Sequence, residues 1–325
     1  MTEIRGGSDM QVLGFDIGGT KCAVIVAEID GNSIQILKKQ RLPTRLDVPP
    51  QEMICRLIQT ADAMINGLGV KRIGISCGGP LDSACGVILG PPNLPGWKDI
   101  PIVQIMEEHF RIPTKLQNDA NACAVAEWKF GAGRGCRNLV FLTFGTGLGA
   151  GLILEGKLYT GTNDNAGEIG HIRLADYGPV GYGKAGSFEG FCSGGGLAQL
   201  GYMKALERVQ CGEYPAYFRP GMTAADITAQ CIAEAAQAGD VTAQAVYHLC
   251  GEQLGRGLSI LIDLLNPEKI VIGSVFARAE RWLRAGMEKT ICCEALSAAV
   301  DCCSVVSAEL GEQLGDYAAV ATALL

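Results

Sequence analysis

The chain has 325 residues, of which 48% are hydrophobic and 19% charged, a composition typical of a soluble globular protein with room for two domains. Its net charge of −7 argues against nucleic acid or an anionic membrane surface as a partner. The first ten residues, Met1–Met10, do not form a signal peptide, and no apolar run reaches the roughly 18 residues of a membrane span. We therefore expect a cytoplasmic protein that holds any anionic ligand with local backbone dipoles and a metal ion.

The first half of the chain predicts a mixed sheet with helices on its faces. Val12 to about Leu37 predicts two or three strands in a hairpin arrangement, whose first turn is Asp30-Gly31-Asn32. Apolar residues recur at helical spacing between Gln51 and Leu68. The elements expected next are a strand at 72–77, a helix at 102–110, a strand at 114–117 and a helix at about 120–130.

From Arg137 the pattern of a strand, a glycine turn and a second strand begins again, which we interpret as an internal structural repeat. The elements expected after the new first strand are a loop region at 160–196, helices up to about 265, a strand at 269–272 and a helix at about 316–324. No linker rich in Pro, Ser or charge separates the halves, which favours two domains joined by a hinge, with a ligand cleft between them.

Fourteen cysteines are a high count, and two pairs of them are adjacent, Cys292-Cys293 and Cys302-Cys303. A disulfide framework is typical of short secreted chains, and adjacent pairs lack the C-x-x-C spacing of metal sites. We predict that most of them are small buried hydrophobic residues in a reducing cytosol rather than redox groups.

Two glycine-rich turns, Asp16–Thr20 and Gly145–Gly149, each lie between two apolar, β-rich runs. Glycine lets backbone N–H groups approach an anion with no side chain in the way. A Walker loop or a dinucleotide-binding fingerprint leads from strand into helix, whereas both turns here lead from strand into strand. Either turn alone can be a hairpin without a ligand, but the pair suggests two clamps on a polyphosphate.

Two aspartates could supply the chemistry of phosphoryl transfer, which needs phosphate clamps, a carboxylate that organises a metal and a base for the nucleophile. Asp16 opens the first turn, where it could hold a hydrated Mg²⁺ or simply cap the turn. Asp119 follows a strand and starts a helix, so it could accept a hydroxyl proton, act as a helix N-cap, or do both. Thr20 and Thr146 can add hydroxyl donors to phosphate oxygens.

Further polar residues lie in loops: Asn93 in the first half and Glu168, His171 and Glu189 in the second. Amides, carboxylates and an imidazole suit a polyhydroxylated ligand, because each sugar hydroxyl both donates and accepts hydrogen bonds. Each of these residues alone is more typical of a solvated loop than of a binding site, but their concentration in polar, Gly-rich loops favours a shared site.

Taken together, these motifs resemble the ROK family (repressors, open reading frames and sugar kinases) over nearly the whole chain. The segments that carry the resemblance are Asp16–Lys21, Pro92–Trp97, Asn118–Asn121, Gly145–Gly151, Gly167–His171 and Asn266–Gly273. The resemblance implies an α/β, actin-like ATPase fold of two ribonuclease H-like domains, with ATP in the cleft between them. The domains expected are 1–120 plus 312–325 and 121–311. It also allows a homodimer.

The resemblance assigns roles to individual residues. Asp119 is the general base, and Mg²⁺ travels with ATP near Asp16. The residues expected to bind the sugar are Gly79, Asn93, Asn118, Asp119, Glu168, His171 and Glu189. The residues expected to bind ATP are Asp16, Gly18, Gly19, Thr20, Lys21, Gly145, Thr146, Gly147 and, near the adenosine, Gly273.

One segment departs from the family pattern. Many members bind structural zinc with the pocket histidine and three cysteines of a C-x-C-G-x-x-G-C-x-E segment. Here those cysteine positions hold Val180, Tyr182 and Ser187, although Gly183, Gly186 and Glu189 are kept. We therefore predict no zinc site, with His171 left to bind sugar.

The sequence thus predicts an ATP-dependent kinase acting on the 6-hydroxyl of a hexose, with glucose as the first candidate. N-acetylmannosamine, mannose, fructose and allose present similar hydroxyl groups and stay open as alternatives. Two other classes are less favoured. One is a sugar-sensing ROK regulator, which would lack a DNA-binding domain because the fifteen residues before Asp16 are too few for a helix-turn-helix module. The other is a non-catalytic actin-like assembly protein, which would not need Asn118-Asp119 together with Glu168 and His171.

Overall fold

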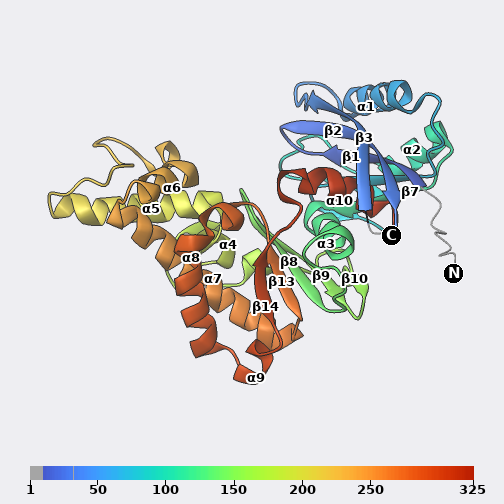
Figure 1. Cartoon of the computed structure of the whole chain (residues 1–325). Coiled ribbons are helices and arrows are strands. Elements are labelled where there is room, and N and C mark those ends of the chain that lie inside the picture. The colour runs from blue at the N-terminus through green and yellow to red at the C-terminus, as the bar shows by residue number, and fades with distance from the viewer. Residues whose placement is uncertain (1–9, 32) are drawn as a thin grey trace. The chain divides into compact units, whose positions relative to one another are not determined.

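The computed structural model describes residues 10–31 and 33–325, which form two compact units (Figure 1). The first unit comprises the described residues up to Cys136, Gly151–Ala166 and Glu309–Leu325. The second unit comprises Arg137–Ala150 and Gly167–Ala308, so the chain passes from one unit to the other four times. The domains predicted from the sequence stay a prediction; in the structure, the helix that spans residue 120 lies wholly in the first unit.

Two five-stranded sheets share one strand order, in which the third strand along the chain is followed by the second, first, fourth and fifth. The first sheet consists of β3 (Ser33–Pro43), β2 (Lys21–Asp30), β1 (Met10–Ile17), β4 (Arg72–Cys77) and β7 (Thr114–Asn118). The second consists of β10 (Lys157–Tyr159), β9 (Leu148–Leu154), β8 (Leu139–Phe144), β13 (Lys269–Ile272) and β14 (Ser304–Ser307). In the first sheet β1, β2 and β3 are antiparallel, whereas β4 and β7 run parallel to β1. The repeated order agrees with the restart seen in the sequence.

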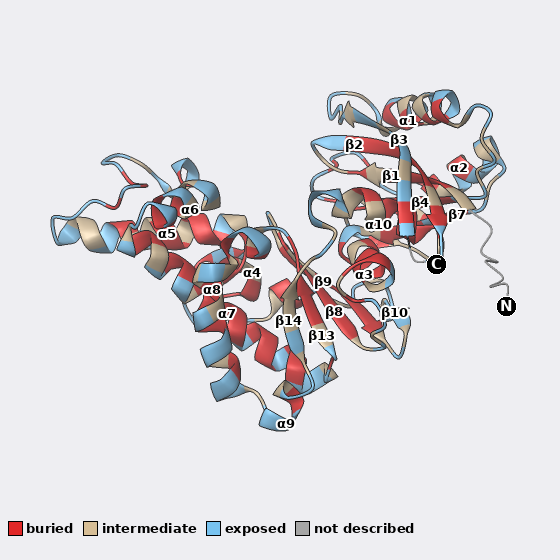
Figure 2. Cartoon of the chain, in the orientation of Figure 1, coloured by how far each residue is buried: buried red, intermediate tan, exposed pale blue. Residues whose placement is uncertain are grey.

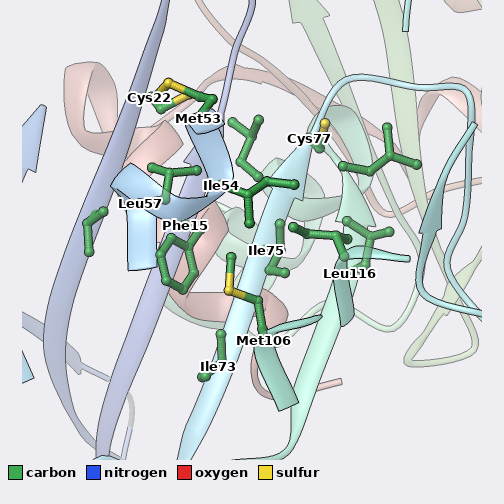
Figure 3. Close-up of a cluster of buried hydrophobic side chains, with 14 of the residues drawn as sticks. Phe15, Cys22, Met53, Ile54, Leu57, Ile73, Ile75, Cys77, Met106 and Leu116 are labelled. Atoms are coloured by element: carbon green, nitrogen blue, oxygen red, sulfur yellow. The ribbon is translucent and has the colours of Figure 1, made fainter. Parts of the chain in front are cut away.

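One face of the first sheet packs against α1 (Pro50–Ile65) and α2 (Ile102–Phe110). Alternate residues of β1, among them Phe15, contact Met53 and Leu57 of α1 in one apolar cluster (Figure 3). Because side chains alternate along a strand, the residues between them, including Asp16, face the other side of the sheet.

That other face is covered by α10 (Leu314–Thr322) and α3 (Asp119–Phe130). The helix α10 is buried along much of its length (Figure 2). It approaches β4 so closely that a Cβ on Gly74 would lie 2.1 Å from the carbonyl oxygen of Ala319. Only glycine allows this approach. The smaller elements of the first unit are β5 (Leu81–Asp82) and β6 (Val87–Ile88).

The second unit is richer in helices, of which α7 and α8 pack along each other. Its helices are α4 (Phe188–Phe191), α5 (Gly194–Gln210), α6 (Ala229–Gln237), α7 (Val241–Leu265), α8 (Val275–Glu294) and α9 (Ser297–Val300). A two-stranded hairpin, β11 (Val180–Gly181) and β12 (Lys184–Ala185), interrupts the loop region before α4. Short 3₁₀ helices lie at Ile169–His171 and Ala224–Asp226 in this unit and at Gly311–Gln313 in the first unit.

The predicted strands and helices are confirmed with small shifts of their ends, but β5, β6, α8, α9 and β14 were missed, and the predicted loop region 160–196 contains β11, β12 and α4. Asn32 of the first predicted turn lies outside the described residues. The prediction that most cysteines are buried is wrong, since only Cys22, Cys77, Cys192 and Cys250 of the fourteen are buried. None of the helices within the described residues is long and apolar enough to cross a membrane.

Candidate active site

The first glycine turn joins β1 to β2, from strand into strand as predicted. A hydrogen bond of 3.2 Å from the N–H of Gly18 to the carbonyl of Lys21 closes it. Asp16 is the last residue but one of β1 and is half-buried. A Cβ on Gly315 would lie 3.4 Å from Asp16 Oδ2, so this carboxylate lies beside the start of α10.

Asn93 lies against two glycine segments that the sequence also singled out. A Cβ on Gly19 would lie 2.4 Å from the carbonyl oxygen of Asn93, and one on Gly78 would lie 3.4 Å from its Oδ1. Leu94 and Trp97, both buried, anchor this loop in the core. The structure therefore brings Asn93 together with the first turn and with the segment that contains Gly79.

Asp119 is the first residue of α3, and Asn118 is the N-cap. The Oδ1 of Asn118 accepts a hydrogen bond of 2.7 Å from the N–H of Asn121. The interpretation of Asp119 as the cap of this helix is therefore wrong. Its Oδ1 accepts only from the N–H of Ala120, at 2.8 Å, among the hydrogen bonds found in the described chain, and the residue is exposed.

Both carboxylates have a raised pKa, and Asp119 contributes to the shift of Asp16. Burial is the main cause that raises the pKa of Asp16 to about 6, and repulsion from Asp316 and Asp119 adds to it, whereas Lys21 and Lys39 act against it. Although Asp119 is exposed, the protein around it desolvates its carboxylate and raises its pKa above the usual range. Asp16 and Asp119 therefore belong to one cluster within the first unit.

Sequence analysis missed Asp316 and Lys39, which complete this cluster. Asp316, in the first turn of α10, is buried and forms an ion pair with Lys39 of β3. The two residues are 277 positions apart, so no local pattern links them. The only signal in the sequence was a Gly-Asp pair at the start of the final predicted helix.

The second glycine turn, Gly145–Gly147, joins β8 to β9 and lies beside the N-terminus of α5. The carbonyl of Gly145 accepts a hydrogen bond of 2.8 Å from the N–H of Gly194, the first residue of α5. Ser193 caps that helix by accepting from the N–H of Gly196 at 3.0 Å. Backbone N–H groups at a helix N-terminus favour anions, so this arrangement suits phosphate oxygens. The Ser-Gly-Gly-Gly run could have predicted it, and we missed it.

Ser274 also lies near this turn, where a Cβ on Gly145 would come within 3.9 Å of its hydroxyl. Ser274 precedes α8 with φ +59 and ψ −109, a region that favours glycine. Its neighbour Gly273 donates a hydrogen bond of 3.0 Å to the carbonyl of Leu142, which extends the pairing of β13 with β8. Gly273 is thus placed near the second turn.

Three predicted sugar residues lie in the second unit. Glu168 and His171 lie at the 3₁₀ turn Ile169–His171, where Glu168 Oε2 is 4.0 Å from His171 Nε2. Glu189, on α4, accepts a hydrogen bond of 3.1 Å from the N–H of Leu148, directly after the second turn. The structure therefore connects Glu189 with the strand that follows the second glycine turn, a contact that the sequence did not suggest.

The residues at the family's zinc positions do not fit a zinc ion. Val180 has no donor atom, and Ser187 is fully buried and caps α4, with its hydroxyl accepting from the N–H of Gly190 at 3.0 Å. Within residues 10–31 and 33–325, no three His, Cys, Asp or Glu side chains are grouped to hold a metal ion. The prediction of no zinc remains a prediction.

The predicted site residues form two groups, one in each unit. The first unit holds Asp16, Gly18, Gly19, Thr20, Lys21, Gly79, Asn93, Asn118 and Asp119. The second holds Gly145, Thr146, Gly147, Glu168, His171, Glu189 and Gly273.

Comparison with known protein families shows that residues 12–324 match the sequence model of the ROK family. A glucokinase of Halalkalibacterium halodurans is 31% identical over 95% of this chain and 93% of its own length. An N-acetylmannosamine kinase of Escherichia coli is 32% identical over 84% of this chain and 86% of its own. The crystal structure of a ROK family glucokinase from Streptomyces griseus, in complex with glucose and AMPPNP, matches 97% of this chain and 99% of that one at 29% identity, with a TM-score of 0.75.

The match extends from β1 to α10, and the fold is that of the actin-like ATPases, with two ribonuclease H-like domains. The chain belongs to the ROK family.

Proposed function

We propose that this protein is an ATP-dependent sugar kinase that transfers the γ-phosphoryl group of ATP to the 6-hydroxyl of a hexose. The observation that carries the proposal is the state of Asp119, an exposed carboxylate with a raised pKa whose capping role is filled by Asn118. Its likeness to a glucokinase and to an N-acetylmannosamine kinase supports the reaction class.

In the proposed step, the oxygen of the sugar hydroxyl attacks the γ-phosphorus, and the hydroxyl proton passes to the carboxylate of Asp119. The bond between the γ-phosphorus and the bridging oxygen breaks, and ADP leaves with its electron pair. A raised pKa makes Asp119 a stronger base than an ordinary aspartate, provided that it is ionised when the sugar binds.

Backbone groups would hold the phosphates. The turn Gly145–Gly147, whose Gly145 N–H donates to the carbonyl of Gly147 at 3.1 Å, and the N-terminus of α5 would stabilise negative charge on the transferred group with backbone N–H groups. Mg²⁺ enters as part of the ATP substrate, and Asp16, beside the turn Gly18–Thr20, is the carboxylate that suits it or its waters. The hydroxyls of Thr20 and Thr146, both exposed at the turns, and the amine of Lys21 can add donors.

We assign the sugar to Gly79, Asn93, Asn118, Glu168, His171 and Glu189, together with Asp119. Glucose is the first candidate substrate and N-acetylmannosamine the alternative, because a glucokinase and an N-acetylmannosamine kinase match this chain at similar identity. A coupled assay of ADP release over a panel of hexoses and N-acetylhexosamines identifies the substrate. If none of the sugars stimulates ADP release above the rate without sugar, the proposed function is wrong.

The decisive variant is Asp119→Asn, which keeps the shape of the side chain but removes the base. We expect kcat to fall by about 10²- to 10⁴-fold, the range typical of a lost general base. Sugar binding, measured by calorimetry, should change little. Asp301→Asn, at an exposed aspartate after α9, is the control and should keep full turnover. A variant at 119 that binds sugar and retains most of its turnover would refute Asp119 as the base.

We further propose that the enzyme works in the cytoplasm, where ATP and free sugars are available, and as a homodimer. Light scattering coupled to size-exclusion chromatography tests the dimer, and a monomeric mass at micromolar concentration would contradict it.

A further inference from the structure

Two side chains of the β11–β12 hairpin contact His171. The rings of His171 and Tyr182 lie 5.1 Å apart between centroids and are nearly perpendicular, with an interplanar angle of 86°. On the same hairpin, Lys184 Nζ donates a hydrogen bond of 2.6 Å to the carbonyl oxygen of His171. The imidazole ring and the backbone of one residue are therefore both contacted by one short hairpin.

The hairpin itself is firmly anchored to the rest of the second unit. The side chain of Gln199 on α5 brackets Val180, accepting from its N–H at 2.8 Å and donating to its carbonyl at 2.9 Å. The N–H of Gly186 donates to the carbonyl of Pro179 at 3.0 Å. An element can hold another residue in one orientation only if it is itself held rigidly.

The segment that carries His171 is tied to the end of the same hairpin. Phe188 N–H donates to the carbonyl of Ile172 at 2.8 Å, and Arg173 Nη1 donates to the carbonyl of Ala185 at 2.7 Å. His171 and the hairpin thus form one hydrogen-bonded frame, and Glu189 of α4 follows directly in the chain.

Tyr182 combines an unfavourable backbone conformation with an exposed side chain. Tyr182 and Gly183 form the two-residue turn, with φ of +45 and +76. Asn, Asp and Gly are the usual residues at such positions, and a tyrosine there is strained. The ring is also 73% exposed, so it adds little to the core of the unit. Its ring contact is with His171, whose side chain is itself 43% exposed and thus open to a ligand.

We propose that the β11–β12 hairpin positions His171 for sugar binding, with Tyr182 setting the orientation of the imidazole ring and Lys184 fixing the backbone. The inference rests on the proposed function, because it takes His171 as a sugar contact. Tyr182 and Lys184 are positioning residues that act through His171. Since an imidazole offers its hydrogen bonds only in the plane of its ring, the orientation of that plane determines which sugar hydroxyls it can reach.

The first experiment follows the imidazole signals of the folded protein by NMR, without substrates. The chain has only three histidines, and the signal that disappears in His171→Asn identifies His171. In Tyr182→Ala we expect the His171 signal to move while those of His109 and His248 stay. Tyr177→Ala is the matched control, because Tyr177 is an exposed tyrosine of the same loop, at 88%, without a ring contact to His171 in the described structure. If the His171 signal does not move in Tyr182→Ala, the proposal is wrong.

The second experiment measures kinetics on the same variants. Loss of an edge-to-face ring pair should raise KM for the preferred sugar by about two- to tenfold in Tyr182→Ala. KM for ATP should stay unchanged, and Tyr182→Phe should restore the sugar KM because it keeps the ring. Lys184→Met should also raise the sugar KM, whereas Tyr177→Ala should not.

The outcomes separate this proposal from the function on which it rests. If His171→Asn raises the sugar KM but Tyr182→Ala and Lys184→Met do not, the positioning role is wrong and the kinase assignment stands. If the enzyme phosphorylates no sugar, the proposed function is wrong, and the NMR shift alone still decides whether Tyr182 orients His171. Equal loss of sugar and ATP affinity in Tyr182→Ala would indicate general loosening and would overturn the proposal.

Discussion

Three aspartates of the first unit lie in one cluster, where Asp316 and Asp119 act through space on Asp16. Asp16 is destabilised in its charged form by burial and by Asp316 and Asp119. Lys39 forms an ion pair with Asp316, and its single positive charge compensates only part of the negative charge of the three aspartates. A cation that arrives with ATP would relieve the remaining repulsion, which is the usual effect of bound metal on acidic sites.

The raised pKa of Asp16 predicts how stability depends on pH. Its folded value is about 6 and its unfolded value 3.8, so the charged form disfavours folding. The stability that protonated Asp16 contributes to the folded state is fully present below its unfolded-state pKa of 3.8. It is lost as the pH rises through the folded-state pKa of about 6. Asp16→Asn removes this loss, and its stability relative to wild type should rise between pH 4 and 7 by up to about 3 kcal/mol.

Urea unfolding of wild type and Asp16→Asn at several pH values, without nucleotide or sugar, measures this difference. A constant difference from pH 4 to 7 would show that Asp16 does not titrate as the structure indicates.

Ser274 is a second residue whose local conformation has a measurable consequence. It adopts φ +59 in front of α8, and a non-glycine residue in such a region costs about 1–3 kcal/mol. Ser274→Gly should therefore raise the free energy of unfolding by about 1 kcal/mol, after the greater backbone entropy of glycine is allowed for. Chemical denaturation measures it. A destabilised variant would mean that the hydroxyl of Ser274 contributes more than its backbone strain costs.

At the level of elements, α3 joins the candidate site to the start of α10. Glu127 of α3 is fully buried, and its carboxylate accepts hydrogen bonds from the N–H groups of Ala132, Glu309 and Leu310 at 2.8, 3.2 and 2.9 Å. The same helix begins with Asp119, and α10 contains Asp316 near its start. Glu127 thus fixes the spacing between the elements that carry two of the three aspartates.

Replacing this carboxylate should cost stability. Glu127→Gln leaves one oxygen for three donors, and a lost hydrogen bond to a charged group is worth about 1.5–3 kcal/mol, so we expect a loss of at least about 2 kcal/mol. Glu108→Gln, at an exposed position on α2, is the matched control and should change stability by less than about 0.5 kcal/mol. Thermal and urea unfolding of both variants measure the difference. Equal stability of the two would show that Glu127 is not the buried anchor described above.

At the scale of the whole molecule, the sequence predicted the repeated architecture because its cues were local. Hydrophobic periodicity located α1, α2 and most strands, and the two glycine turns marked corresponding places in the two halves. Asn118-Asp119 was recognised as a strand-to-helix junction, but its two residues could not be told apart as cap and free carboxylate without coordinates.

What could not be predicted depended on contacts between distant residues. The pairing of Lys39 with Asp316 and the contact of Tyr182 with His171 leave no periodic trace in the sequence. The exposed cysteines were misjudged for a related reason, since average burial tendencies say little about single helix positions such as Cys292 and Cys293. The roles of the site residues in catalysis stay predictions.

The placement of α10 has a consequence for how the protein is made. This helix covers β1 and β4, and the absence of a side chain at Gly74 lets it pack closely. The second unit, however, lies between β4 and α10 in the sequence, so it is translated before α10. On the ribosome, the part of the first sheet that α10 covers, over β1 and β4, must therefore stay uncovered until the second unit has been synthesised. During that interval a nascent chain would offer its uncovered apolar side to chaperones, or to a neighbouring polypeptide on the same messenger.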